Sequence, residues 1–197
     1  MAEEFATFSH IRLKPGTGFA RPPELPRLVH LDSPASEVMT DLRVVRVVTI
    51  GPEVSIDEAL ETMKTRGVRL LLVTGDGDDI LGLITAKDIQ GEKPIKIARE
   101  SRIPHSAITV QAVMTPRSSI EVLNMLSLRN ARVGHIVATL QELARQHALV
   151  VEVDPKTKAQ CVRGIFSTSQ ISKHLGVNAA EVVTRASTLA EIGNDIH

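Results

Sequence analysis

The sequence of 197 residues has no tryptophan, no tyrosine and only four phenylalanines. Base-stacking platforms for nucleic acid are therefore nearly absent, and a core must be built from Val, Leu, Ile and Ala. Hydrophobic residues make up 43% of the chain, which is enough for such a core. The single cysteine, Cys161, excludes an intrachain disulfide and indicates a reducing compartment.

Net charge is also absent, because Lys and Arg total 23 and Asp and Glu total 23. A general electrostatic attraction to nucleic acid or anionic lipid is not expected, so neither is predicted as a partner. No apolar run reaches the roughly 20 residues that a membrane helix needs. The N-terminus lacks the basic start and apolar block of a signal peptide. These absences predict a soluble, cytoplasmic protein.

Proline is concentrated near the start of the chain, with five residues between Pro15 and Pro34. Proline lacks an N–H group and fixes φ, so this stretch is neither regular helix nor central strand. We predict that residues 1–33 form a proline-rich arm and that periodic structure begins after it.

The rest of the chain contains a duplication. Three pairs of segments correspond, at shifts of 75, 77 and 82 residues: 38–40 with 113–115, 54–73 with 131–150, and 82–89 (GLITAKDI) with 164–171 (GIFSTSQI). The growing shift predicts two residues inserted before the second helix and five in the second hairpin turn. Insertions that fall in turns while helices and strands keep their register are typical of a true repeat.

Each copy reads as β-α-β-β-α, an α/β unit. In the first copy the predicted elements are a β-branched strand at 44–50, a helix opened by Ser55 and Glu58 and closed by Gly67, a buried strand at 70–73, a return strand at 80–85, and a short helix from Thr85 to Gly91. One unit leaves an apolar sheet face uncovered, and the other unit is the expected cover.

The ending Thr85-x-x-Asp88 has two interpretations. In the structural one, Thr85 is an N-cap and Asp88 completes a capping box, as Ser167 and Gln170 would in the second copy. In the functional one, the hydroxyl and helix start hold a phosphate, while the carboxylate accepts hydrogen bonds from the diol of a ribose. Gln170 in place of aspartate would then leave a second pocket with weaker ribose binding.

The duplicated pattern of VMT, helix, LLLV and GLITAKDI resembles a tandem pair of cystathionine β-synthase (CBS) domains, or Bateman module, over roughly residues 34–177. The resemblance implies two β-α-β-β-α repeats packed sheet to sheet with pseudo-twofold symmetry. We expect a first repeat at 34–100, a second at 101–178 and a helical tail at 179–197.

The resemblance also implies a function. Such modules bind AMP, ADP, ATP or S-adenosylmethionine in clefts between the repeats and commonly form flat homodimers. We therefore expect a stand-alone regulatory module without enzymatic activity, an energy sensor that binds an adenine nucleotide and signals to a partner protein.

The resemblance carries over residues for two sites. In the main site Leu83 would flank the adenine, Thr85 and Lys87 would contact phosphate, Asp88 would hold the ribose, Gln146 and His147 would approach the phosphates, and Val122 and Leu123 would contact the base. A second, weaker site would use Val68, Arg69, Ile165, Ser167, Ser169 and Gln170. Plainer roles also exist, because Lys87 could be solvated, Arg69 could pair with an acid, and His147 could be a partly buried structural histidine.

Three other functions remain open. Residues 168–187 mimic a helix-turn-helix, but they lack the positive charge that binding to DNA phosphates requires. An enzyme is disfavoured because no metal-ligand spacing is present, and the acidic turn at 75–79 lacks the glutamate of a calcium loop. A scaffold that dimerises without ligand is the third alternative, and thermal stability with AMP or ATP would distinguish it.

Overall fold

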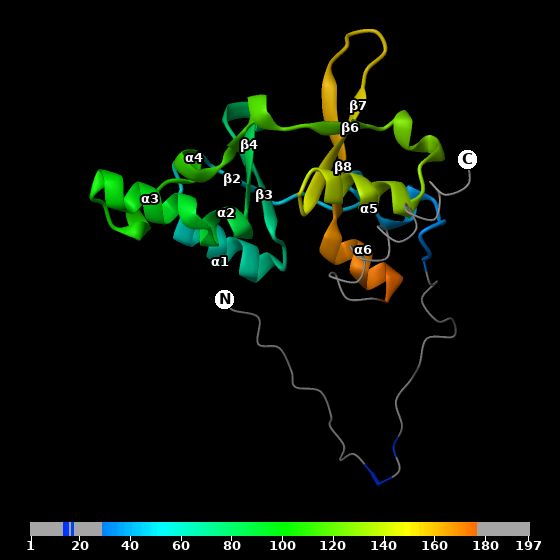
Figure 1. The fold of residues 1–197 in the computed structure, drawn as a ribbon, viewed down its shortest axis with the longest axis horizontal. Helices are drawn as coiled ribbons and strands as arrows, with labels where there is room; N and C mark the ends of the chain where they lie inside the picture. The colour runs from blue at the N-terminus through cyan, green and yellow to red at the C-terminus, as the bar shows by residue number, and fades with distance from the viewer. Residues whose placement is uncertain (1–13, 16, 18–28, 177–197) are drawn as a thin grey trace, which may run out of the picture.

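The computed structural model describes residues 14, 15, 17 and 29–176, and it contains two bodies that each hold a four-stranded sheet with helices against it (Figure 1). The first body contains the sheet with strand order β2-β3-β4-β5, and the second body contains the sheet with order β1-β8-β7-β6. This architecture confirms the predicted α/β fold with two related repeats. Among the described residues, no helix is long and apolar enough to cross a membrane.

The strands and helices have the following bounds. The strands are β1 Thr40–Asp41, β2 Thr49–Ile50, β3 Leu70–Thr74, β4 Ile80–Thr85, β5 Thr115–Pro116, β6 Val122–Asn124, β7 His147–Val153 and β8 Gln160–Ser167. The α-helices are α1 Ile56–Arg66, α2 Ala86–Gln90, α3 Glu92–Ser101, α4 Val110–Val113, α5 Val133–Glu142 and α6 Thr168–Leu175.

The helix and hairpin of the first copy follow the local signals in the sequence. Ser55 caps α1 by accepting a hydrogen bond from the backbone N–H of Glu58, and Gly67 ends the helix in the left-handed region at φ 66°. Residues 70–73 of β3 are all buried, as their continuous apolar run predicts. The return strand β4 covers residues 80–85 as expected.

The two bodies exchange their leading segments. Residues 35–41 precede the first sheet in the chain, yet Ala35 and Val38 are buried in the core of the second body and β1 pairs with β8. Residues 110–116 do the reverse, because Val110 and Val113 are buried in the first body and β5 pairs with β4. The chain therefore crosses between the bodies twice, at about 42–48 and 117–121 (Figure 1).

Two equivalent glycines allow these exchanged segments to approach. A Cβ atom on Gly82 in β4 would lie 2.5 Å from the carbonyl oxygen of Thr115, and one on Gly164 in β8 would lie 2.5 Å from the sulfur of Met39. Each glycine begins the duplicated phrase that ends in Thr85 or Ser167. The phrase thus combines a close strand contact with a helix cap.

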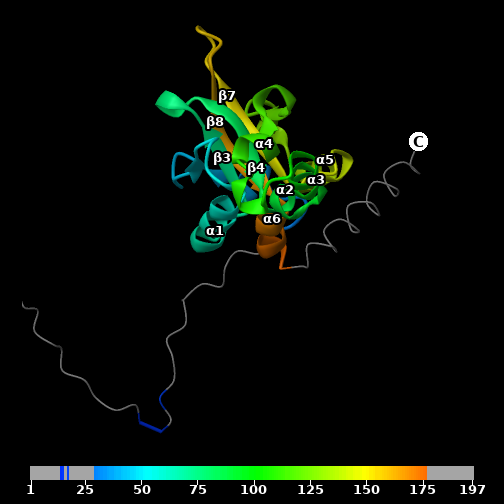
Figure 2. The ribbon, with the colours of Figure 1, turned by 90° about the vertical axis from the view of Figure 1, so that its left-hand side faces the viewer.

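The two sheets meet across an apolar layer. Leu70 and Leu72 of β3 pack with Leu149 of β7, and Leu83 and Ile165 join them as partly buried neighbours. From the side, the first body lies in front of the second (Figure 2). The sheet-to-sheet packing is therefore made by the aliphatic side chains that the shortage of aromatic residues predicts.

The exchanged strand β1 is also held by charge. Arg163 of β8 donates hydrogen bonds to both carboxylate oxygens of Asp41, and its side chain is only 13% exposed. Arg43 extends this network by binding Glu152 at 2.6 Å. A bidentate arginine–carboxylate pair fixes orientation as well as proximity, so it anchors residues 40–43 to the second body.

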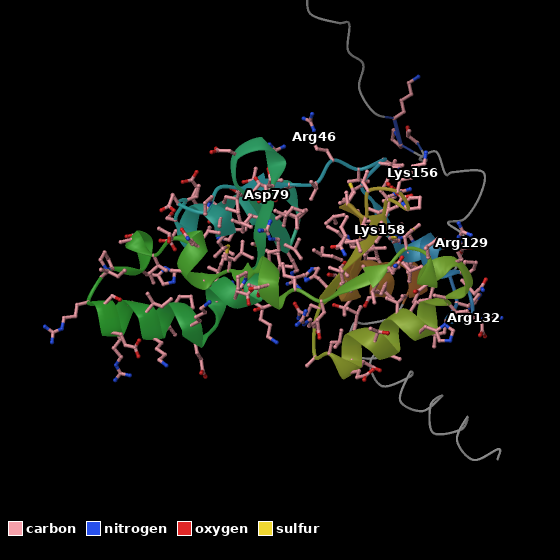
Figure 3. The ribbon with its side chains drawn as sticks, turned by 90° about the horizontal axis from the view of Figure 1, so that it is seen from above. Arg46, Asp79, Arg129, Arg132, Lys156 and Lys158 are labelled. Atoms are coloured by element: carbon pink, nitrogen blue, oxygen red, sulfur yellow. The ribbon has the colours of Figure 1, made fainter. Side chains whose placement is uncertain are left out.

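The second hairpin is the longer of the two, and it projects beyond the sheets (Figure 1). β7 has seven residues against five in β3, β8 has eight against six in β4, and the turn has six residues against five. The five inserted residues are thus two in each strand and one in the turn, rather than all in the turn. Asp79 marks the end of the first turn and Lys156 and Lys158 lie in the second turn (Figure 3).

Other expectations were wrong. The predicted strand at 44–50 is reduced to Thr49–Ile50, and Val44 is 82% exposed, because this stretch crosses between the bodies and meets β3 only at its end. Helix α3 follows Gly91 at once and was not predicted, although Pro94 in its first turn is a recognised start signal. The tail at 179–197, most of the arm at 1–33 and the second half of the helix-turn-helix lie outside the described residues.

Candidate functional site

The phrase GLITAKDI places a carboxylate at the start of α2. Thr85 accepts a hydrogen bond from the backbone N–H of Asp88 at 3.2 Å. Asp88 Oδ2 accepts hydrogen bonds from the backbone N–H and the hydroxyl of Thr85, at 2.8 and 2.6 Å. The capping box is therefore present, and all of its hydrogen bonds to Asp88 use one carboxylate oxygen. Oδ1 accepts no hydrogen bond from the residues that the structure describes.

The second copy keeps only half of this arrangement. Ser167 accepts a hydrogen bond from the backbone N–H of Gln170 at 3.2 Å, as a cap requires. The side chain of Gln170 does not return to Ser167, because its Nε2 lies 3.0 Å from Nε2 of His174, one turn further along α6. The change from aspartate to glutamine therefore replaces a two-way cap with a one-way cap and removes a negative charge.

Asp88 faces a cleft of about 610 Å³ between the two bodies, which we refer to as the first cleft. Its lining comes from α2 and the start of α3, from β5, from the crossing at 117–121 and from the start of β7. The lining residues are Leu83, Thr85, Lys87, Asp88, Gly91, Glu92, Lys93, Thr115, Ile120, Glu121, Ala144, Arg145, Gln146, His147 and Leu149. Small-molecule sites commonly measure about 300–1,000 Å³, so this cleft has room for a nucleotide.

Positive and negative side chains balance in the first cleft. Lys87, Lys93 and Arg145 face Asp88, Glu92 and Glu121, three of each sign. Arg145 forms an ion pair with Glu121 at 3.4 Å. Lys93 donates a hydrogen bond to the carbonyl of Val113 at 2.8 Å, which ties the start of α3 to the exchanged helix α4.

A second cleft of about 580 Å³ lies against the other copy of the motif. It is lined by Thr40, Leu60, Met63, Lys64, Gly67, Val68, Arg69, Leu70, Ala86, Gln90, His147, Ile165, Ser167, Ser169, Gln170 and Lys173. Its cations are Lys64, Arg69 and Lys173, and no described residue in its lining is a carboxylate. The two clefts are built from equivalent elements, but charges of both signs line the first and, among the described residues, only positive charges line the second.

His147 lines both clefts, because it is the first residue of β7. The pKa of His147 is lowered from 6.5 to about 4, mainly by burial and also by the charge of Arg69 in the second cleft, while the charge of Asp88 in the first cleft opposes the shift. The imidazole is therefore neutral at pH 7. His147 thus lies between a cation of one cleft and a carboxylate of the other.

The structure brings together most of the residues chosen from the sequence. Leu83, Thr85, Lys87, Asp88, Gln146 and His147 line the first cleft, and Val68, Arg69, Ile165, Ser167, Ser169 and Gln170 all line the second. Val122 and Leu123 are not among the lining residues. They lie in β6, where Val122 is 37% exposed and Leu123 packs against the core of the second body. Ile120 and Glu121 line the first cleft at this point.

Several lining residues had not been chosen from the sequence. Arg145 adjoins the predicted Gln146 and could have been found from that neighbourhood. Thr115 enters because β5 pairs with β4, and Glu92 and Lys93 enter because α3 begins directly after Gly91. The last three depend on the exchanged segments and on a helix that periodicity did not reveal.

Comparison with known proteins identifies the fold. Residues 35–92 match the family model of the CBS domain. A conserved protein from Pyrococcus horikoshii is 23% identical over 74% of this chain and 93% of its own, with a TM-score of 0.52. A CBS-domain protein from Agrobacterium tumefaciens is 20% identical over 75% of this chain and 98% of its own, also with a TM-score of 0.52.

A further structural relative is a conserved CBS-domain protein from Thermoplasma acidophilum. It is 18% identical over 78% of this chain and 75% of its own, with a TM-score of 0.53. No curated protein matches the chain by sequence. At these identities the solved structures establish the fold and leave the ligand to be argued from the clefts.

Proposed function

We propose that this chain, which matches the CBS-domain model over residues 35–92 and shares its fold with CBS-domain proteins, is a regulatory module that binds an adenosine-containing nucleotide, AMP, ADP or ATP, in the first cleft. The ligand would be bound without turnover. Its presence would be signalled to a partner protein. This function would make the chain a sensor of adenine nucleotides.

The observation that carries the proposal is the hydrogen bonding of Asp88. Oδ2 is used by Thr85, while Oδ1 is left for a group that enters the cleft. A carboxylate oxygen that is held in place by its partner oxygen is a pre-organised acceptor for a ribose hydroxyl. Hydrogen bonds to a charged acceptor are stronger than neutral ones, so this contact would favour ligands with a free diol.

The rest of the lining suits the other parts of a nucleotide. Leu83, Ile120 and Leu149 are aliphatic side chains on facing elements, and they offer an apolar slot for a base. Lys87 and Arg145 also line this cleft, and their positive charges suit phosphate. Arg145 already has Glu121 as a partner, so a phosphate would compete with that carboxylate for the guanidinium.

Signalling follows from where the first cleft lies. Asp88 belongs to the first body and Arg145 to the second, so a ligand that contacts both would favour one relative packing of the bodies. A ligand shifts a conformational equilibrium by its difference in affinity for the two states. A protein that contacts both bodies, either a second copy of this chain or a regulated protein, would bind differently to the two packings.

We expect Asp88→Ala to weaken AMP binding by about 2 kcal/mol, roughly thirtyfold, because a charged hydrogen bond of about 1.5–3 kcal/mol is lost. Isothermal titration calorimetry of AMP, ADP and ATP against wild type and variant measures the effect. The same titrations would identify which of the three ligands binds most tightly.

Glu58→Ala is the matched control, because Glu58 occupies the same helix position in α1 and lines neither cleft. It should leave AMP affinity unchanged. If Asp88→Ala binds AMP as tightly as wild type, Asp88 does not hold the ribose and the proposed site is wrong.

A scaffold that needs no ligand is the second candidate function, favoured by the pairing already present in the first cleft. Thr85 already donates hydrogen bonds to one oxygen of Asp88, and Arg145 already forms an ion pair with Glu121. We expect AMP at 100 times its Kd to raise stability by about 2.7 kcal/mol, seen as a higher midpoint of thermal unfolding. An unchanged midpoint with millimolar AMP, ADP and ATP would instead support the scaffold.

A further inference from the structure

The second cleft differs from the first in the charge of its lining. At three equivalent positions it is more positive: Arg69 stands where the first cleft has Gln146, Lys173 where it has Gly91, and Gln170 where it has Asp88. At one position it is less positive, because Ser169 stands where the first cleft has Lys87. The described lining of the second cleft as a whole has three cations and no acid.

Two of these cations are not neutralised by a neighbour. Arg69 and Lys173 are exposed, and neither forms an ion pair with any residue that the structure describes. Lys64 is bound by Glu61 at 2.6 Å. Concave surfaces lined by charge of one sign concentrate ions of the opposite sign, so this cleft should attract anions at physiological pH.

Hydroxyl groups complete the donor set. Ser167 and Ser169 lie at the start of α6, and Thr40 of the exchanged strand, which pairs with Ile165 of β8, also lines the second cleft. Arg69 also lies within electrostatic range of His147, since its charge contributes to the lowered pKa of that imidazole. Arg69 and His147 both line the second cleft.

We infer that the second cleft binds a compact phosphate polyanion, such as pyrophosphate or the polyphosphate group of a nucleotide, without a requirement for ribose. Arg69 and Lys173 would supply the charge, and the serine hydroxyls would donate to phosphate oxygens. The described lining of the cleft has no carboxylate that could accept hydrogen bonds from a diol. This inference does not depend on nucleotide binding in the first cleft, because different side chains carry it.

Calorimetric titration of the full chain with pyrophosphate tests the inference. We expect wild type to bind pyrophosphate, and Arg69→Gln to bind it at least tenfold more weakly, since a charge-assisted contact is lost. Lys173→Gln should also weaken binding. Arg69→Gln copies the residue at the equivalent position of the first cleft and changes an exposed side chain, so the fold should be retained, as circular dichroism would verify.

Three controls locate the site and its chemistry. Asp88→Ala should leave pyrophosphate affinity within about twofold, since Asp88 lines the first cleft. Gln170→Asp should weaken pyrophosphate binding by adding a negative charge beside the cations. Titration with adenosine, which has the ribose but no phosphate, should give the same affinity for wild type and Arg69→Gln.

The outcomes separate this inference from the proposed function. Pyrophosphate binding that is lost in Arg69→Gln but kept in Asp88→Ala supports the anion site whether or not AMP binds. Absence of binding at millimolar pyrophosphate, or equal affinity in wild type, Arg69→Gln and Lys173→Gln, would overturn it. A lower affinity for adenosine in Arg69→Gln would also contradict the inference, because the second cleft would then bind the nucleoside itself.

Discussion

Gly82→Ala should lower the free energy of unfolding by about 3 kcal/mol, while Gly164→Ala should lower it by about 1 kcal/mol. The added methyl at 82 would lie 2.5 Å from the carbonyl oxygen of Thr115, a backbone atom held by the pairing of β4 with β5. The methyl at 164 would meet the side chain of Met39 instead. A methionine side chain can change rotamer, whereas a paired strand must move as a whole.

Urea unfolding of the two variants measures this difference. Gly51→Ala is the matched control, because its new methyl would make only an ordinary contact, 3.7 Å from Val54. If both variants lose the same free energy of unfolding, the exchanged strand β5 moves aside as easily as the side chain of Met39. That result would contradict a close, fixed approach of β5 to β4.

The second large effect is a loss of stability in acid that depends on His147. Its pKa is about 4 in the folded protein and 6.5 for a free side chain, so between these pH values the unfolded chain binds a proton that the folded chain excludes. The contribution of His147 is complete above pH 6.5 and is lost as the pH falls toward 4. A difference of this size corresponds to about 3 kcal/mol.

Urea unfolding at a series of pH values should therefore show a smaller loss between pH 7 and pH 4 for His147→Gln than for wild type, by about 3 kcal/mol. NMR titration of the imidazole in the folded protein should give a midpoint near pH 4. Arg69→Gln should raise that midpoint, because the charge of Arg69 contributes to lowering it. A wild-type midpoint near 6.5 would contradict this prediction and show that His147 is solvated.

Much of this protein could be predicted because its strongest signals are local. The cap of α1 by Ser55, the left-handed Gly67 and the buried run of β3 each depend on neighbours in the chain, and each is observed. The duplication repeats the pattern of helix and strands in the second half of the chain. It also identified Asp88 and Gln170 as equivalent positions before their surroundings were known.

The errors share one physical cause. The residues at 44–48 have the β-branched composition of a strand, but a strand forms only where another backbone supplies hydrogen bonds, and here the chain is crossing between bodies. Which residues of 120–123 line the first cleft likewise depends on where the second crossing meets it. Neither crossing can be inferred from periodicity within one repeat.

By itself, the sequence determined the repeated unit, the apolar runs that become the central strands, and the two helix caps, because caps use hydrogen bonds between near neighbours and apolar runs are visible in the chain itself. The tertiary structure alone decided which body receives each leading segment. It also decided which charges share a cleft, balanced around Asp88 and positive around Arg69. Those outcomes depend on contacts between residues far apart in the chain, and only the packing of two folded sheets against each other creates them.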